Sequence, residues 1–284
     1  MYYLNILTIL LLLLNSNCTP RLSELENQPF PKAYNLANYE KIKLQDDLEE
    51  VSGLHWVGEN QLWAIEDESS IIYRIDPKTG KILKKRKFAK NKDIEDLLVL
   101  NDVAWVLQSN GTLYEVTSPL TKDAQTTEYH FPIKEKRDLE AIVASKTEPY
   151  LFILCKACKW DKGPEKASVF RFDLTSKSYD TIPFETLKRE NIQPLLTSQL
   201  DKPLDIQPSA IALHPIENQY YIISSSGKWL LIADTDFIAK EVYNLDSRIF
   251  KQPEGITFDQ KGNMYISNEA QDGEPNILIF EFNP

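Results

Sequence analysis

The chain has 284 residues, 42% hydrophobic and 11% aromatic, enough to bury the core of one large domain or two small ones. Its formal net charge of -10 argues against nucleic-acid binding, which depends on clustered Lys and Arg, so we expect no nucleic-acid partner. The 16 prolines and the frequent Val, Ile, Thr, Tyr and Phe favour strands over long helices.

The chain begins with an apolar run, Ile6 to Leu14, that is too short to span a bilayer but suits the core of an export signal. The residues that follow, up to Cys18, resemble a bacterial lipoprotein cleavage site, at which the Cys is lipidated. We predict a signal peptide over residues 1–18 with lipidation at Cys18 and a tether over residues 19–38. A plain secretory signal and a buried strand are the alternatives.

A short pattern recurs five times in the remaining chain, residues 39–284, which we expect to form a single domain. It reads as a polar residue, a spacer, Glu or Ser, a small residue, and Leu or Ile, and about four strand-like runs accompany each copy. Periods of about 40 to 50 residues with four strands are typical of propeller blades. We use the Glu or Ser of each copy as its register position. These residues are spaced at intervals of 43, 45, 69 and 45 and are Ser52, Glu95, Glu140, Ser209 and Glu254.

The last copy has only three strands before Pro284, whereas a spare strand, Tyr39 to Leu44, precedes the first copy. We expect this strand to complete the last blade and to remove an open edge. The sequence therefore predicts an all-β, five-bladed propeller closed by an N-terminal strand, with six blades as the alternative. The longest interval holds an insertion near residues 185–203, whose apolar spacing predicts a short amphipathic helix, either a lid on the channel or a rim element.

The innermost strand of each blade lines the channel of a propeller, so the repeated polar positions should form a ring around one mouth. Carboxylates that converge there repel one another unless a cation intervenes, which suits Ca²⁺ with oxygen ligands. The alternative is a structural latch, in which each carboxylate caps backbone N–H groups of the next blade. The candidate metal ligands are Glu50, Asp93, Glu95, Asp138, Glu140 and Glu254, and the ring also includes Ser52, Gln207, Ser209 and Gln252.

A second polar layer ends the next strand of each blade and differs among the blades. Such variation is expected of a binding site on a repeated scaffold, and also of ordinary surface drift. The candidate ligand-binding residues are Glu66, Asp67, Lys156, Asn268 and Glu269.

Cys155 and Cys158 form a single Cys-x-x-Cys pair, without the further ligands of a zinc site or a thioredoxin-like context. Export favours a local disulfide between them, with free buried thiols as the alternative.

Four of the copies carry a family resemblance: Glu-x-Ser-Gly-Leu at residues 50–54, Asp-Ile-Glu-Asp-Leu at 93–97, Asp-Leu-Glu-Ala-Ile at 138–142 and Gln-Pro-Glu-Gly-Ile at 252–256. They resemble the SdiA-regulated family of bacterial envelope propellers over about residues 39–284. The resemblance implies a link to Ca²⁺ and a phytase-like hydrolase activity.

Two functions are consistent with these features. The first is a monomeric, non-catalytic propeller of the bacterial envelope, lipid-anchored, periplasmic or secreted, that binds Ca²⁺, a small ligand or a protein partner at the channel mouth. It is favoured because no nucleophile elbow, P-loop or Gly-rich phosphate cradle is recognisable. The second is a Ca²⁺-dependent phosphoester or ester hydrolase, whose phosphate contacts would come from Arg137, Lys156, Lys159 or Lys228.

Overall fold

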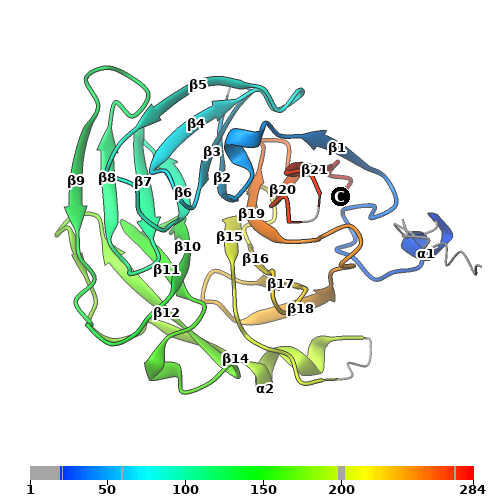
Figure 1. Ribbon diagram of the computed structural model, residues 1–284. Coiled ribbons are helices and arrows are strands. Elements are labelled where there is room, and N and C mark those ends of the chain that lie inside the picture. The colour runs from blue at the N-terminus through cyan, green and yellow to red at the C-terminus, as the bar shows by residue number, and fades with distance from the viewer. Residues whose placement is uncertain (1–19, 21, 59, 198–201, 272) are drawn as a thin grey trace, which may run out of the picture.

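Five antiparallel sheets surround a central channel, and each sheet is one blade of a propeller (Figure 1). The computed structural model describes residues 20, 22–58, 60–197, 202–271 and 273–284. The predicted signal peptide and Cys18 lie outside the described residues. Within them, no helix has the length and hydrophobicity needed to cross a membrane.

Blades 1 to 4 each follow the chain from the channel outward. Blade 1 consists of β2 (Val51–Gly58), β3 (Gln61–Glu66), β4 (Ile71–Ile75) and β5 (Ile82–Lys87). Blade 2 consists of β6 (Ile94–Leu100), β7 (Val103–Gln108), β8 (Leu113–Thr117) and β9 (Gln125–Tyr129). Blade 3 consists of β10 (Leu139–Ala144), β11 (Tyr150–Cys155), β12 (Lys166–Asp173) and β13 (Ser178–Tyr179). Blade 4 consists of β15 (Ala210–Leu213), β16 (Tyr220–Ser224), β17 (Trp229–Ala233) and β18 (Ala239–Asn244).

Blade 5 is completed from the other end of the chain. Its inner strands are β19 (Pro253–Phe258), β20 (Met264–Asn268) and β21 (Asn276–Phe280), and its outermost strand is β1 (Tyr39–Lys43). β1 pairs antiparallel with β21 over its full length, from Tyr39 opposite Phe280 to Lys43 opposite Asn276. The predicted five blades and the closure by the N-terminal strand are therefore confirmed.

Apolar side chains gather between neighbouring blades. The described residues form five buried clusters, one at each of the five interfaces around the ring. At the seam, for example, Leu54 and Leu62 of blade 1 pack with Tyr265 and Ile277 of blade 5. Because each blade buries both faces against its neighbours, the ring depends on every interface.

The insertion near residues 185–203 differs from its prediction. It begins with a strand, β14 (Glu185–Lys188), that pairs with β12, and continues with the one-turn helix α2 (Arg189–Ile192) and the 3₁₀ turn η3 (Gln193–Leu195). Thr186 and Leu187 pair with Ser168 and Ala167, so ladder hydrogen bonds replace the expected helix there. Both helical turns contact β18 at the periphery, so the described part of the insertion is no lid on the channel (Figure 1).

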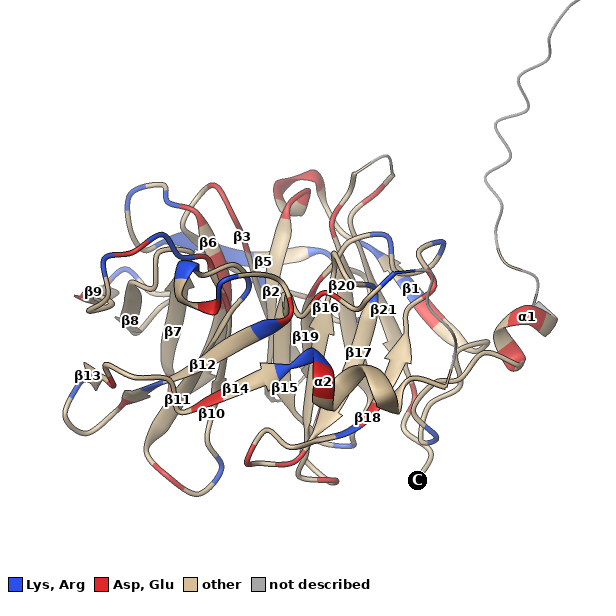
Figure 2. Cartoon of the chain, turned by 90° about the horizontal axis from the view of Figure 1, so that it is seen from below, with Lys and Arg blue, Asp and Glu red and all other residues tan. Residues whose placement is uncertain are grey.

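The segment before β1 belongs largely to the domain. The short helix α1 (Leu22–Glu26) lies at the edge of the molecule beyond β1 (Figure 2). Phe30 and Tyr34 are buried against blades 4 and 5, and the Tyr34 hydroxyl donates a hydrogen bond of 2.6 Å to the Gly262 carbonyl. The packed domain thus begins before residue 39, and the predicted tether over residues 19–38 is too long. Pro and Asn content indicated a linker, but the aromatic residues within it decide the packing.

Candidate functional site at the channel mouth

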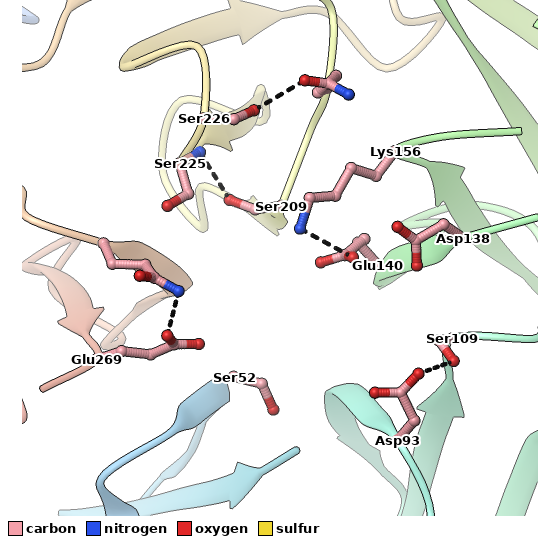
Figure 3. Close-up of polar contacts among 12 residues, drawn as sticks. Ser52, Asp93, Ser109, Asp138, Glu140, Lys156, Ser209, Ser225, Ser226 and Glu269 are labelled. Atoms are coloured by element: carbon pink, nitrogen blue, oxygen red, sulfur yellow. Dashed lines mark hydrogen bonds and ion pairs between the residues drawn. The ribbon is translucent and has the colours of Figure 1, made fainter. Parts of the chain in front are cut away.

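The channel widens at one mouth into a polar cavity of about 420 Å³. Figure 3 shows side chains from all five blades around this space. All six carboxylates predicted as metal ligands line the cavity. Its lining residues are Glu50, Ser52, Asp67, Asp93, Glu95, Asp138, Glu140, Lys156, Gln252, Glu254 and Glu269.

A bulge at the start of four inner strands moves the Glu or Ser of the repeat out of the strand pairing. Ladder pairing in β2, β6, β10 and β19 skips one residue each time: Ser52, Glu95, Glu140 and Glu254. A bulged residue leaves the alternation of the strand, so its side chain can turn toward a site. Both members of the carboxylate pairs, Asp93 with Glu95 and Asp138 with Glu140, reach the mouth.

The structure contains contacts of the kind expected for the structural latch between blades, but two serines and Asp96 form them instead of the predicted carboxylates. Ser52 Oγ donates to the Ile94 carbonyl of the next blade at 2.9 Å, and Ser209 Oγ donates to the Pro253 carbonyl of the next blade at 3.0 Å. Asp96 joins blades 2 and 3, because its carboxylate accepts the Ile142 N–H at 2.9 Å. Serines and one buried aspartate therefore connect blades at these points.

Asp96 is not among the residues that we predicted from the repeat, although the repeat contains a signal for it. The other four copies carry Gly or Ala at this position, namely Gly53, Ala141, Ala210 and Gly255. Space is short there: a Cβ on Gly53 would lie 2.7 Å from Asp96 Oδ1. The single acidic residue at a position that is otherwise small indicates a specific structural role.

Glu95, Asp138 and Glu140 form the tightest carboxylate cluster of the mouth. Each brings a carboxylate oxygen to within 4.8 Å of the others. Burial raises the pKa of Glu95, and the charges of Glu140, Asp93 and Asp138 raise it further. Burial also raises the pKa of Asp138 and of Glu140. A bound cation would offset this repulsion.

Lys156 is the one lysine that lines the mouth among the described residues. Its Nζ lies 3.0 Å from Glu140 Oε1, and this ion pair and the nearby Glu254 raise the pKa of Lys156 despite its burial. Lys156 stands between Cys155 and Cys158, which the structure joins by a disulfide. The small disulfide ring anchors the backbone of Lys156 at the end of β11.

The seam between blades 1 and 5 supplies a second group of carboxylates. Burial, together with the charges of Glu254, Asp67 and Glu50, raises the pKa of Glu269 to about 8. Gln252 donates a side-chain hydrogen bond to Glu269. Burial raises the pKa of Asp67, which also shares a hydrogen bond with Glu50. Glu254 is 8% exposed, and burial raises its pKa while Lys156 opposes that shift.

Two predicted ligand-binding residues do not reach the mouth. Glu66 is buried and accepts the backbone N–H of Glu68 at 3.0 Å. Asn268 is fully buried and donates to Asn276 Oδ1 at 3.1 Å. Consecutive residues of a strand face opposite sides. The side chains of Glu66 and Asn268 therefore point into the protein interior, whereas those of Asp67 and Glu269, one position later, face the channel mouth.

The other basic residues considered for phosphate contact do not line the cavity, although the charge of Glu254 acts on Lys228. Arg137 donates to the carbonyls of Asn110 and Glu135, and Lys159 pairs with Glu135 at 3.5 Å. Lys228 donates to the Lys251 carbonyl. Blade 4 adds no carboxylate to the described lining of the mouth. Its Gln207 side chain instead accepts a hydrogen bond from Ser226.

The opposite end of the channel is apolar. A cavity of about 230 Å³ lies there, surrounded by the later parts of the five inner strands. Burial lowers the pKa of His55, which lies in this cavity, to about 4, so His55 is neutral at pH 7. Charge is therefore concentrated at one end of the channel.

Fold and site together define a five-bladed β-propeller whose channel has one acidic mouth. The chain belongs to the SdiA-regulated family, whose sequence model matches residues 32–282. The resemblance noted in the repeats is thereby confirmed.

Solved structures share the fold at low sequence identity. Glutaminyl cyclase from Myxococcus xanthus is 9% identical with a TM-score of 0.56, and the alignment covers 86% of this chain and 94% of that one. A luciferin-regenerating enzyme is 11% identical with a TM-score of 0.52, covering 86% of this chain and 95% of that one. These identities support the fold alone. No curated protein matches the sequence.

Proposed function

We propose that this protein is a non-catalytic propeller of the bacterial envelope that binds Ca²⁺ at the acidic mouth of its channel. Export and lipidation at Cys18 are part of the proposal and rest on the sequence before the described residues. The cluster of Glu95, Asp138 and Glu140 is the main support for a cation.

The donor set fits Ca²⁺. Ca²⁺ prefers carboxylate oxygens at about 2.3–2.6 Å, so two oxygens on the same ion lie at most about 5 Å apart. The 4.8 Å limit on the oxygens of Glu95, Asp138 and Glu140 meets this requirement. Asp93 and Glu254 line the same cavity and could complete the shell directly or through water.

The charge balance also favours a cation over a phosphoester. Lys156 is outnumbered by Glu50, Asp67, Asp93, Glu95, Asp138, Glu140, Glu254 and Glu269. A phosphate group entering this mouth would meet carboxylates that already repel one another, whereas Ca²⁺ would be attracted by all of them. We therefore favour binding over phosphoester hydrolysis.

Calorimetric titration of the full-length protein with Ca²⁺ tests the proposal. We expect saturable binding, weakened by at least about 100-fold in Glu95→Gln/Glu140→Gln, since each of the two lost interactions with a charged group contributes roughly 1.5–3 kcal/mol. The matched control is Glu148→Gln, an exposed residue in the turn between β10 and β11, which should bind like the wild type.

Two results would overturn parts of this proposal. An absence of Ca²⁺ binding by the folded wild type would leave the acidic mouth without the cation role. Hydrolysis of p-nitrophenyl phosphate that requires Ca²⁺ and is lost in Glu254→Gln would contradict the non-catalytic assignment.

A further inference from the structure

A second cleft lies on the opposite face of the propeller, at the seam between blades 1 and 5. It has a volume of about 520 Å³ and is lined by turns that follow the inner strands, including Asn60 and Gln260, and by the turn residue Lys78. This volume falls within the range of about 300–1,000 Å³ that is usual for small-molecule sites. The cleft is separate from the acidic mouth, because the mouth residues stand at the start of β2 and β19 whereas Asn60 and Gln260 follow the ends of these strands.

Two aromatic rings form one wall of the cleft. Trp56 of β2 and Tyr265 of β20 have ring centroids 5.2 Å apart with an interplanar angle of 32°. The Trp56 backbone N–H donates to Thr257 Oγ1 of β19 at 3.0 Å, which fixes β2 to the last blade. Trp56 remains partly exposed, whereas Tyr265 is buried. The wall is therefore a rigid aromatic surface with one accessible ring.

A row of paired residues crosses blade 5 beside this wall. Thr257 pairs with Tyr265, Tyr265 with Ile279, and Ile279 with Glu40. The row passes from aromatic through aliphatic to charged within three strands. A ligand lying along it would meet an apolar surface at one end and a carboxylate at the other.

The rim of the cleft is polar and nearly balanced in charge. Its acidic and basic residues are Glu40, Asp259 and Glu281 against Lys78 and Lys261. Asp259 organises one turn, since its Oδ1 accepts the N–H groups of Lys261 and Asn263, both at 2.9 Å. Asn60 and Gln260 are exposed amides without a side-chain hydrogen bond to another described residue, and each offers both a donor and an acceptor.

We propose that this cleft binds a neutral saccharide. A sugar ring has an apolar C–H face, which can lie on Trp56, and an edge of hydroxyls, which need partners that both donate and accept. Asn60 and Gln260 supply amides, and Glu40 supplies an acceptor. The near balance of charge distinguishes this cleft from the acidic mouth and suits an uncharged ligand. This inference is independent of Ca²⁺ binding.

The test follows the indole N–H signal of Trp56 by NMR in the ¹⁵N-labelled full-length protein. The Trp56→Phe variant identifies the signal. The probes are cello-, malto-, xylo- and chito-oligosaccharides. We expect at least one of these series to shift the Trp56 signal saturably.

Variants separate a site from a general effect. We expect Gln260→Ala, a change in an exposed turn residue, to weaken binding about fivefold or more, as the loss of one hydrogen bond of about 1 kcal/mol implies. Phe184→Ala, which removes an exposed aromatic ring on blade 3, should bind like the wild type. Failure of all four series to shift the Trp56 signal at millimolar concentration, or equal binding by wild type and Gln260→Ala, would overturn the proposal.

Discussion

The two ends of the channel are built by the same five inner strands, yet they differ in chemistry. At the mouth, bulged residues such as Glu95 and Glu140 place carboxylates in a common space. A few residues further along, Leu97 and Ile142 are 1% and 2% exposed and belong to the apolar end. Each inner strand therefore serves two purposes: its first residues can vary in chemistry because they face the mouth, whereas its later residues must pack against apolar neighbours.

Substitutions that exchange the chemistry of the two ends should have the largest effect on stability. Leu97→Glu places a carboxylate among apolar side chains and should lower the free energy of unfolding by about 4 kcal/mol or more. Glu95→Leu, two residues earlier, removes repulsion at the mouth and should raise the free energy of unfolding by about 1 kcal/mol. Urea denaturation without Ca²⁺ measures both. Equal losses in the two variants would show that both ends are simply core.

Lys156 provides a sharper test of the mouth, since it occupies part of the space that a cation would use. Lys156→Gln removes the ion pair with Glu140, so Ca²⁺ should bind about tenfold more tightly, a difference of about 1.4 kcal/mol. The control is Ser145→Asp, which adds a carboxylate about 16 Å along β10 from Glu140 at about 3.3 Å per residue. Screening should keep its effect below about twofold. Weaker Ca²⁺ binding by Lys156→Gln in calorimetry would mean instead that Lys156 positions the carboxylates.

The carboxylates at the seam should also make stability depend on pH. The pKa of Glu269 rises from 4.5 in the unfolded chain to about 8 in the folded protein, so between these values the folded state holds more protons. Its contribution to the free energy of unfolding therefore falls as pH rises from about 4.5 to 8. Glu269→Gln should make the measured decline shallower, and Ca²⁺ should stabilise the wild type most at the upper end. Urea denaturation at pH 5, 6.5 and 8 compares the two proteins.

Much of the fold could be predicted because the same order of polar, small and apolar residues recurs in every blade. Five register residues gave the blade count, and the spare strand from Tyr39 gave the closure. The insertion was predicted less well, because the apolar spacing of Leu187 and Ile192 fits a helix and also fits a strand followed by a turn. Local pattern cannot choose between them when a free edge such as β12 is available for pairing.

The candidate site could be predicted by position more readily than by role. The six carboxylates expected at the mouth are there, since the repeat fixes where each inner strand begins. The role of each residue depends on contacts that the repeat does not show. Asp96 links blades 2 and 3, and the side chains of Glu66 and Asn268 point into the protein interior, away from the channel. Those outcomes follow from one-residue bulges and from which face is buried, which sequence spacing alone does not reveal.

The closure of blade 5 by β1 bears on how the protein folds. Blades 1 to 4 pair strands that are close in sequence, so each can form soon after its residues are available. Joining Lys43 to Asn276 instead closes a loop of nearly the whole chain, at a greater entropic cost than the short hairpins of the other blades. We expect ring closure to be the slow step of folding, with the exposed edge of β21 vulnerable to mispairing until β1 arrives.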